Sequence, residues 1–98
     1  MKELEQKVVA WAEAKGLIFK GNEFVQFAKT LEEVEEVRVE LESGNDKKLE
    51  LEIGDTGITL INVCAIKGLT LEGCIRAAYA KIKDRKGETI NGDFVREK

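Results

Sequence analysis

The 98-residue sequence contains no histidine and no proline, and only two cysteines. Without histidine, the chain has no Ser–His triad, no histidine acid–base catalysis and no histidine-containing zinc site. The two cysteines, Cys64 and Cys74, are too few for a four-thiolate zinc site within one chain. We expect both to be free, buried thiols in a reducing cytoplasm. The absence of proline suits long, uninterrupted helices.

The sequence also lacks long apolar runs and an excess of basic charge. No run approaches the ~18 residues that a membrane span requires, and the charged N-terminus has no apolar signal core. Sixteen basic and 19 acidic residues give a net charge of −3, which argues against a nucleic acid polymer as partner. We therefore expect a cytoplasmic protein with no membrane partner. Its length predicts a single domain that covers residues 1–98.

Apolar residues recur at helical spacing in four segments, which predicts an all-α fold. The first expected helix covers 2–15 and ends at Gly16, and the second begins at Glu23 after the N-cap Asn22. The third covers 47–67 and ends at Gly68, and the fourth runs from the N-cap Thr70 to near Gly87. The tail 88–98 is polar except for Ile90, Phe94 and Val95, which would hold it against a neighbouring segment.

One segment permits a second interpretation. Residues 37–53 alternate apolar and charged side chains about a Gly44-Asn45 turn, which is a β-hairpin pattern. However, Glu, Leu and Lys dominate this segment, and these residues favour helices over strands. Its apolar positions also continue the helical faces on either side. We predict a helix here and keep the hairpin as the alternative.

If the two central segments are helical, each carries a polar stripe beside its apolar face. One stripe contains Gln26, Lys29, Glu33, Glu36 and Glu40, and the other contains Lys48, Glu52, Asp55, Thr59 and Asn62. Each stripe holds two carboxylates three residues apart and a lysine four residues before the first of them. A short turn at 43–46 would make the helices antiparallel neighbours, with their stripes facing each other.

Carboxylates that converge from two helices repel one another unless a cation lies between them. An all-oxygen ligand set favours Mg²⁺ or Mn²⁺ over zinc, and Mg²⁺ commonly completes its shell with water and phosphate oxygens. The two lysines, with Lys81 and Arg85 one turn apart on the fourth helix, would then bind phosphates. The alternative is that the acidic stripes are ordinary solvated helix faces.

A family resemblance rests on these residues. The run Glu32-Glu33-Val34-Glu35-Glu36, followed by Glu52-Ile53-Gly54-Asp55, resembles the EExxE…ExxD signature of the MazG-like all-α nucleoside triphosphate pyrophosphohydrolases. The similarity extends over nearly the whole chain, including 11–17, 81–87 and 91–94, and the chain resembles the short, phage-type single-domain members. It implies a four-helix MazG-like bundle, assembled as an intertwined homodimer or homotetramer. It also implies cleavage of an NTP or dNTP between the α- and β-phosphates, giving the monophosphate and pyrophosphate.

Carried over by residue, the resemblance assigns metal and phosphate ligands. The metal ligands would be Glu33, Glu36, Glu52 and Asp55, and the phosphate ligands Lys29, Lys48, Lys81 and Arg85. The two sets together predict an Mg²⁺-dependent or Mn²⁺-dependent enzyme with a triphosphate substrate. Glu32 lies off the main stripe, so we assign it a role as general base or as a residue of the outer shell around the metal ligands.

The base-binding residues are less defined by the sequence. Asn62 lies on the second stripe, two turns after Asp55, and its amide can bond to a nucleobase edge. Trp11 or Tyr79 could stack on the base, and the alternative for both is packing in the core. The few aromatic residues also predict a thin core, which favours a homo-oligomer with the active site near the subunit interface.

Two other functions remain open from the sequence. The triplet Asp55-Thr56-Gly57 is that of retropepsin-like aspartic proteases, and it would follow a strand if the hairpin interpretation were right. The other alternative is a non-catalytic helical interaction protein whose acidic faces are only soluble surface.

Overall fold

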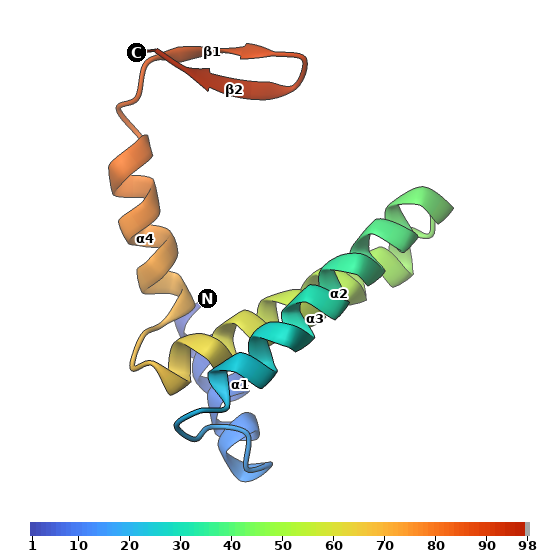
Figure 1. The fold of residues 1–98 in the computed structure, drawn as a ribbon, viewed down its shortest axis with the longest axis vertical. Coiled ribbons are helices and arrows are strands. Elements are labelled where there is room, and N and C mark those ends of the chain that lie inside the picture. The colour runs from blue at the N-terminus through green and yellow to red at the C-terminus, as the bar shows by residue number, and fades with distance from the viewer. Residues whose placement is uncertain (98) are drawn as a thin grey trace.

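The computed structural model describes residues 1–97, and it confirms the all-α prediction. Four helices are followed by a two-stranded sheet (Figure 1). The elements are α1 (Lys2–Ala14), α2 (Glu23–Ser43), α3 (Asp46–Ile66), α4 (Leu71–Ile82), β1 (Gly87–Ile90) and β2 (Asp93–Arg96). No single helix in this part of the chain is long and apolar enough to cross a membrane. Taken together, α3 and α4 have the length and composition of a membrane span, but the chain bends by 95° between them.

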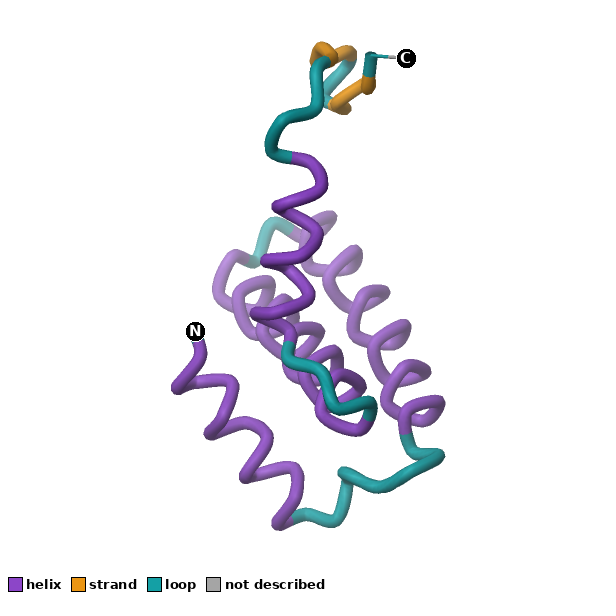
Figure 2. Tube along the Cα trace, turned by 90° about the vertical axis from the view of Figure 1, so that its left-hand side faces the viewer, coloured by secondary structure: helices purple, strands orange, loops and turns teal. Residues whose placement is uncertain are grey.

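The longest elements, α2 and α3, lie side by side and antiparallel (Figures 1 and 2). Residues 37–53 are helical on both sides of the turn, so the hairpin alternative is wrong. The Gly-Asn pair ends one helix and starts the next. Gly44 ends α2 with a φ of 75°, and the Asn45 side chain accepts a hydrogen bond from the Lys48 N–H at 3.1 Å.

Most of the predicted helix limits hold, with one change of role. Gly16 and Gly68 follow their helices with φ of 75° and 72°. The Thr70 hydroxyl caps α4 by accepting from the Gly73 N–H at 3.0 Å. Asn22 precedes α2, but it does not cap it, because its amide donates to the Leu17 carbonyl oxygen at 2.6 Å. This residue therefore closes the loop between α1 and α2.

The C-terminal region differs from the prediction. Helix α4 ends at Ile82 and not near Gly87, since no apolar residue recurs at helical spacing until Ile90. The chain then forms the β1–β2 hairpin about Asn91 and Gly92, which both have positive φ. A Cβ on Gly87 would lie 2.8 Å from the ring of Phe94, so the glycine allows the two strands to pair.

The interface between α2 and α3 is largely polar. The Thr30 hydroxyl donates to the Thr59 hydroxyl at 2.8 Å, and the Asn62 amide donates to Oε1 of Gln26 at 2.9 Å. In contrast, the buried hydrophobic residues of the described chain are only Ala12, Ile61 and Cys64. The core of one chain is therefore thin, as expected from the sequence.

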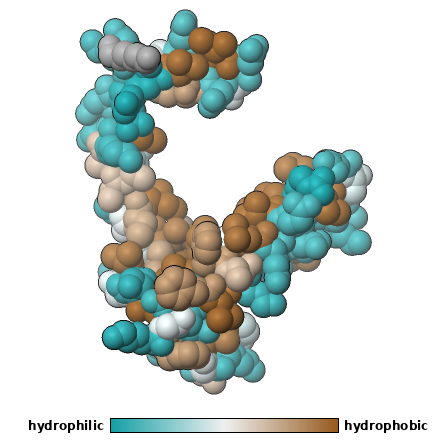
Figure 3. Space-filling model, viewed as in Figure 1, coloured by the Kyte–Doolittle hydropathy of each residue, from teal (hydrophilic) through white to brown (hydrophobic). Residues whose placement is uncertain are grey.

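Large hydrophobic side chains remain exposed over much of the surface. Figure 3 shows them where α4 meets the α2–α3 pair and along that pair. The accessible surface is 7650 Å² for an 11.0 kDa chain. A folded monomer of this mass exposes ~5,600 Å², so the excess is roughly 2,000 Å². The exposed hydrophobic side chains lie within this large surface, which the single chain does not cover.

Candidate metal and nucleotide site

Three predicted carboxylates meet between the two long helices. Oxygen atoms of Glu33 on α2 and of Glu52 and Asp55 on α3 lie within 4.8 Å of one another. Glu33 and Glu52 are half-buried and Asp55 is exposed. The three-residue spacing brings the two α3 side chains to the same helix face, which the antiparallel pairing turns toward Glu33. We call these three residues the acidic cluster.

The electrostatics of the acidic cluster are unfavourable without a cation. A hydrogen bond with Glu33 raises the pKa of Glu52 above the ordinary value of a glutamate. Partial burial, the charge of Glu33 and the charges of Asp55 and Glu40 raise the same pKa further. Glu52 holds its proton more tightly because the like charges around it disfavour its ionised form.

The acidic cluster differs from the predicted four-carboxylate set in one residue. Glu36 is exposed on α2 and does not belong to the group of three. Glu40 lies on the same stripe and was not assigned a role from the sequence. It is half-buried, and its Oε2 is buried without a hydrogen-bond partner among the described residues. Its place on the polar stripe was the signal that could have identified it.

The donor set fits a divalent cation. It consists only of carboxylate oxygens, which are the hard ligands that Mg²⁺ and Mn²⁺ prefer. Glu33, Glu52 and Asp55 each offer an oxygen within 4.8 Å of the other two, so these three residues could hold a metal ion. A cation there would also remove the repulsion that raises the Glu52 pKa. Asp55, at the exposed side, would face solvent and substrate.

The predicted phosphate ligands are not gathered at the acidic cluster in a single chain. The ammonium group of Lys29 lies 3.3 Å from the Glu32 carboxylate, and both side chains are exposed. Lys48 is exposed one turn before Glu52. Lys81 is in the last turn of α4, which points away from the α2–α3 pair (Figure 1). Arg85 lies beyond the end of α4, so the predicted shared helix face of Lys81 and Arg85 is wrong.

A small pocket opens beside the acidic cluster. It has a volume of about 420 Å³ and is lined by Lys7, Val8, Trp11, Asp55 and Ile58. The Trp11 side chain is 52% exposed, so the alternative of core packing does not hold for it. The pocket joins an aromatic surface on α1 to the exposed carboxylate of the acidic cluster. Lys7, Val8 and Ile58 were not predicted from the sequence, because only the packing of α1 on α3 brings them there.

The other two candidate base-binding residues lie in different surroundings. Tyr79 is 62% exposed on α4, so it does not pack in the core of this chain either. Asn62 is only 2% exposed, and its amide nitrogen bonds to Gln26. Its Oδ1 is buried without a partner among the described residues. In the single chain Asn62 therefore joins two helices, and its contact with a base stays a prediction.

The aspartic protease alternative is not supported by the fold. It required Asp55 to follow a β-strand, but Asp55 lies in the middle of α3. The two strands of the described chain lie at its C-terminal end. The triplet Asp55-Thr56-Gly57 is consequently a helical segment, and the Thr56 hydroxyl donates to the Glu52 carbonyl oxygen.

Comparison with known proteins adds a family match. Residues 25–89 match the family model described as the MazG nucleotide pyrophosphohydrolase domain. The matched region includes all three carboxylates of the acidic cluster and extends from α2 to β1. Comparisons with curated proteins and with solved structures found no match.

Proposed function

The chain belongs to the MazG nucleotide pyrophosphohydrolase family, and from this premise we propose that it hydrolyses a nucleoside or deoxynucleoside triphosphate to the monophosphate and pyrophosphate. The reaction depends on Mg²⁺, with Mn²⁺ as a substitute. The observation that carries the proposal is the convergence of Glu33, Glu52 and Asp55 within 4.8 Å. The family indicates nucleotide pyrophosphohydrolysis, and the proposal adds the metal and the triphosphate.

The acidic cluster would hold the metal, with Glu36 on the adjacent turn of α2 as the fourth ligand. When bound, the ion supplies charge neutralisation on the phosphate oxygens and activates water for attack on phosphorus. Water is the expected nucleophile, because the chain has no histidine and no recognisable Ser or Cys nucleophile motif. Glu32, the residue before Glu33, would orient that water or hold its proton from outside the metal site.

Lysine and aromatic side chains would bind the rest of the substrate. Lys29 and Lys48 lie on the same stripes as the carboxylates, so their ammonium groups can reach phosphate oxygens. Trp11 and Asp55 line the same pocket, which supports a base stacked on the Trp11 indole beside the proposed metal site. Tyr79 and Asn62 are the second and third candidates for contact with the base.

The active protein is a homodimer or homotetramer. The exposed surface in excess of a folded monomer, roughly 2,000 Å² per chain, is of the size that obligate dimers cover. A stripe of exposed apolar side chains on α2 supports this proposal, and it contains Phe24, Phe27, Leu31 and Val34. A second copy could also supply Lys81 and Arg85 to the acidic cluster. Lys81 is in the last turn of α4 and Arg85 follows that helix, which points away from the α2–α3 pair of its own chain (Figure 1).

The test is a panel of common and damaged NTPs and dNTPs incubated with Mg²⁺, with the products separated by chromatography. A monophosphate and pyrophosphate are expected from at least one member. Glu52→Ala should abolish this turnover, whereas Glu50→Ala, an exposed carboxylate of α3 outside the acidic cluster, should retain it. A diphosphate with orthophosphate would refute the cleavage site. No hydrolysis of any member would favour the non-catalytic interaction protein.

A further inference from the structure

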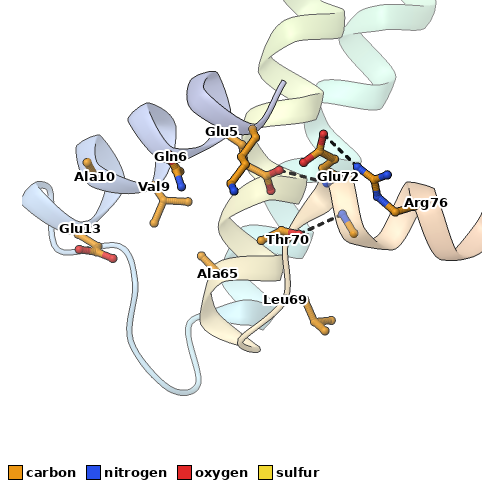
Figure 4. A pocket seen from close by; sticks show the side chains of 12 residues that line it. Glu5, Gln6, Val9, Ala10, Glu13, Ala65, Leu69, Thr70, Glu72 and Arg76 are labelled. Atoms are coloured by element: carbon orange, nitrogen blue, oxygen red, sulfur yellow. Dashed lines mark hydrogen bonds and ion pairs between the residues drawn. The ribbon is translucent and has the colours of Figure 1, made fainter.

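One buried carboxylate has no part in the proposed reaction. Glu5 on α1 is only 4% exposed, in a chain whose other acidic side chains are half-buried or exposed. Its two oxygens accept hydrogen bonds from the backbone N–H groups of Leu71 and Glu72, the latter at 3.1 Å. Figure 4 shows the carboxylate directed at the first turn of α4. A residue near the start of the chain thus binds the N-terminus of its last helix.

The hydrogen bonds that Glu5 accepts are not needed merely to cap α4. Thr70 already caps this helix locally, by accepting from the Gly73 N–H. Glu5 satisfies two further N–H groups and brings a negative charge to the positive end of the helix dipole. Because it does so from α1, it also fixes where the first turn of α4 lies relative to the rest of the protein.

Few other contacts hold α4 in place. None of its residues is buried, and most of its side chains are exposed. Near its N-terminus, the Cys74 sulfur lies 3.9 Å from the sulfur of the buried Cys64 on α3. The pocket between α1 and the start of α4 is about 690 Å³ in volume, so packing across this junction is incomplete. The two hydrogen bonds that α4 donates to the Glu5 carboxylate are therefore a main link between α4 and α1.

We propose that Glu5 is a positioning residue: it fixes the direction in which α4 leaves the body of the protein, and thereby the place of Lys81 at the far end of that helix. The role of Lys81 rests on the function proposed above. Glu5 itself touches neither metal nor substrate. A small change in the direction of α4 at its first turn becomes a larger displacement at Lys81, about three turns further along the helix.

The test compares Glu5→Gln with Glu13→Gln. Glutamine has nearly the size of glutamate but can accept only one of the two N–H bonds, and it lacks the charge. Glu13 lines the same pocket from α1 and is exposed, so its variant is a matched control for loss of charge. The first measurement is the rate at which a disulfide reagent modifies Cys64 and Cys74 in the native protein. Loss of one of these hydrogen bonds, and of the charge that strengthens the other, should raise this rate roughly tenfold or more in Glu5→Gln.

The second measurement separates positioning from general destabilisation. Glu5→Gln should raise KM for the triphosphate several-fold with kcat nearly unchanged, and Glu13→Gln should change neither. In a Lys81→Ala background, Glu5→Gln should have no further effect on KM, because both changes remove the same contact. If Glu5→Gln raised KM equally in the native protein and in Lys81→Ala, Glu5 would not act by positioning Lys81.

Equal thiol modification rates in Glu5→Gln and Glu13→Gln would overturn the proposal outright. The thiol measurement also keeps this proposal distinct from the proposed function. If the native protein hydrolysed no triphosphate, the function would fail, and the modification rates would still decide whether Glu5 holds α4.

Discussion

The side-chain amide of Asn62 donates a hydrogen bond of 2.9 Å to Oε1 of Gln26, and this buried pair joins α3 to α2. Gln26 lies seven residues before Glu33, and Asn62 lies seven residues after Asp55. Because the helices are antiparallel, the amide pair lies two turns from the acidic cluster on both of them. The pair thus sets the helix register that brings the carboxylates together.

We first predict that Asn62→Leu lowers the free energy of unfolding by about 1–3 kcal/mol, since it leaves the buried Gln26 side chain without its partner. The double variant Gln26→Leu with Asn62→Leu should recover most of the loss, because neither buried amide then remains unpaired. Urea unfolding at one fixed protein concentration measures both. A double variant that is less stable than Asn62→Leu alone would show that the pair does not act as a unit.

The four helices could be predicted from local pattern alone. Apolar residues at helical spacing, Gly44 as an αL helix end and Thr70 as an N-cap all act within a few residues. The acidic cluster followed from the same periodicity, because a short turn leaves antiparallel pairing as the simplest arrangement of α2 and α3. Glu33, Glu52 and Asp55 were therefore predictable as a group from their spacing along the chain.

Contacts between distant segments were not predictable in this way. Glu5 is 66 residues from Leu71, and although its spacing to Val9 and Ala12 puts it on the packed face of α1, nothing in the local sequence identifies its partner. The same holds for the packing that places Lys7 and Trp11 beside Asp55. The end of α4 was missed for a different reason, since strong helix formers continue beyond Ile82 without an apolar face to bury.

We next predict that millimolar Mg²⁺ raises the melting temperature of the native protein, because it binds the folded acidic cluster and not the unfolded chain. Glu52→Ala should remove this rise, and it should melt above the native protein in the absence of metal, because it relieves repulsion. Thermal denaturation followed by circular dichroism measures both effects. Glu50→Ala is the control, and it should respond to Mg²⁺ like the native protein.

The raised pKa of Glu52 also predicts a pH dependence in the absence of metal. The folded chain binds this proton more tightly than the unfolded chain, so the ionised group opposes folding at every pH above its folded pKa. That unfavourable contribution disappears as pH falls through the raised pKa toward the ordinary value of 4.5. The stability of the native protein minus that of Glu52→Gln, measured against pH, should therefore rise as pH is lowered. A flat difference would contradict the repulsion assigned to the acidic cluster.

The exposed apolar stripe on α2 predicts the oligomeric state. Leu31 is 56% exposed at the centre of this stripe, and a charge there would have to be buried in the subunit interface. Light scattering should give at least a dimer for the native protein and a smaller mass for Leu31→Glu. Leu31→Met keeps an apolar side chain of similar size and should keep the native mass. A native mass equal to one chain at all concentrations would contradict the proposed oligomer.

The last prediction uses Trp11, the only tryptophan of the chain, as a reporter of substrate binding. Its ring is 52% exposed in the pocket that Asp55 also lines, so a base bound beside the metal would stack on it. A triphosphate with a non-hydrolysable α–β bridge should quench the fluorescence saturably in the presence of Mg²⁺. Glu52→Ala, which lacks a metal ligand, should need a much higher concentration for the same quenching. Quenching that is absent, or equal in both proteins, would place the base elsewhere and leave Tyr79 as the remaining exposed aromatic candidate.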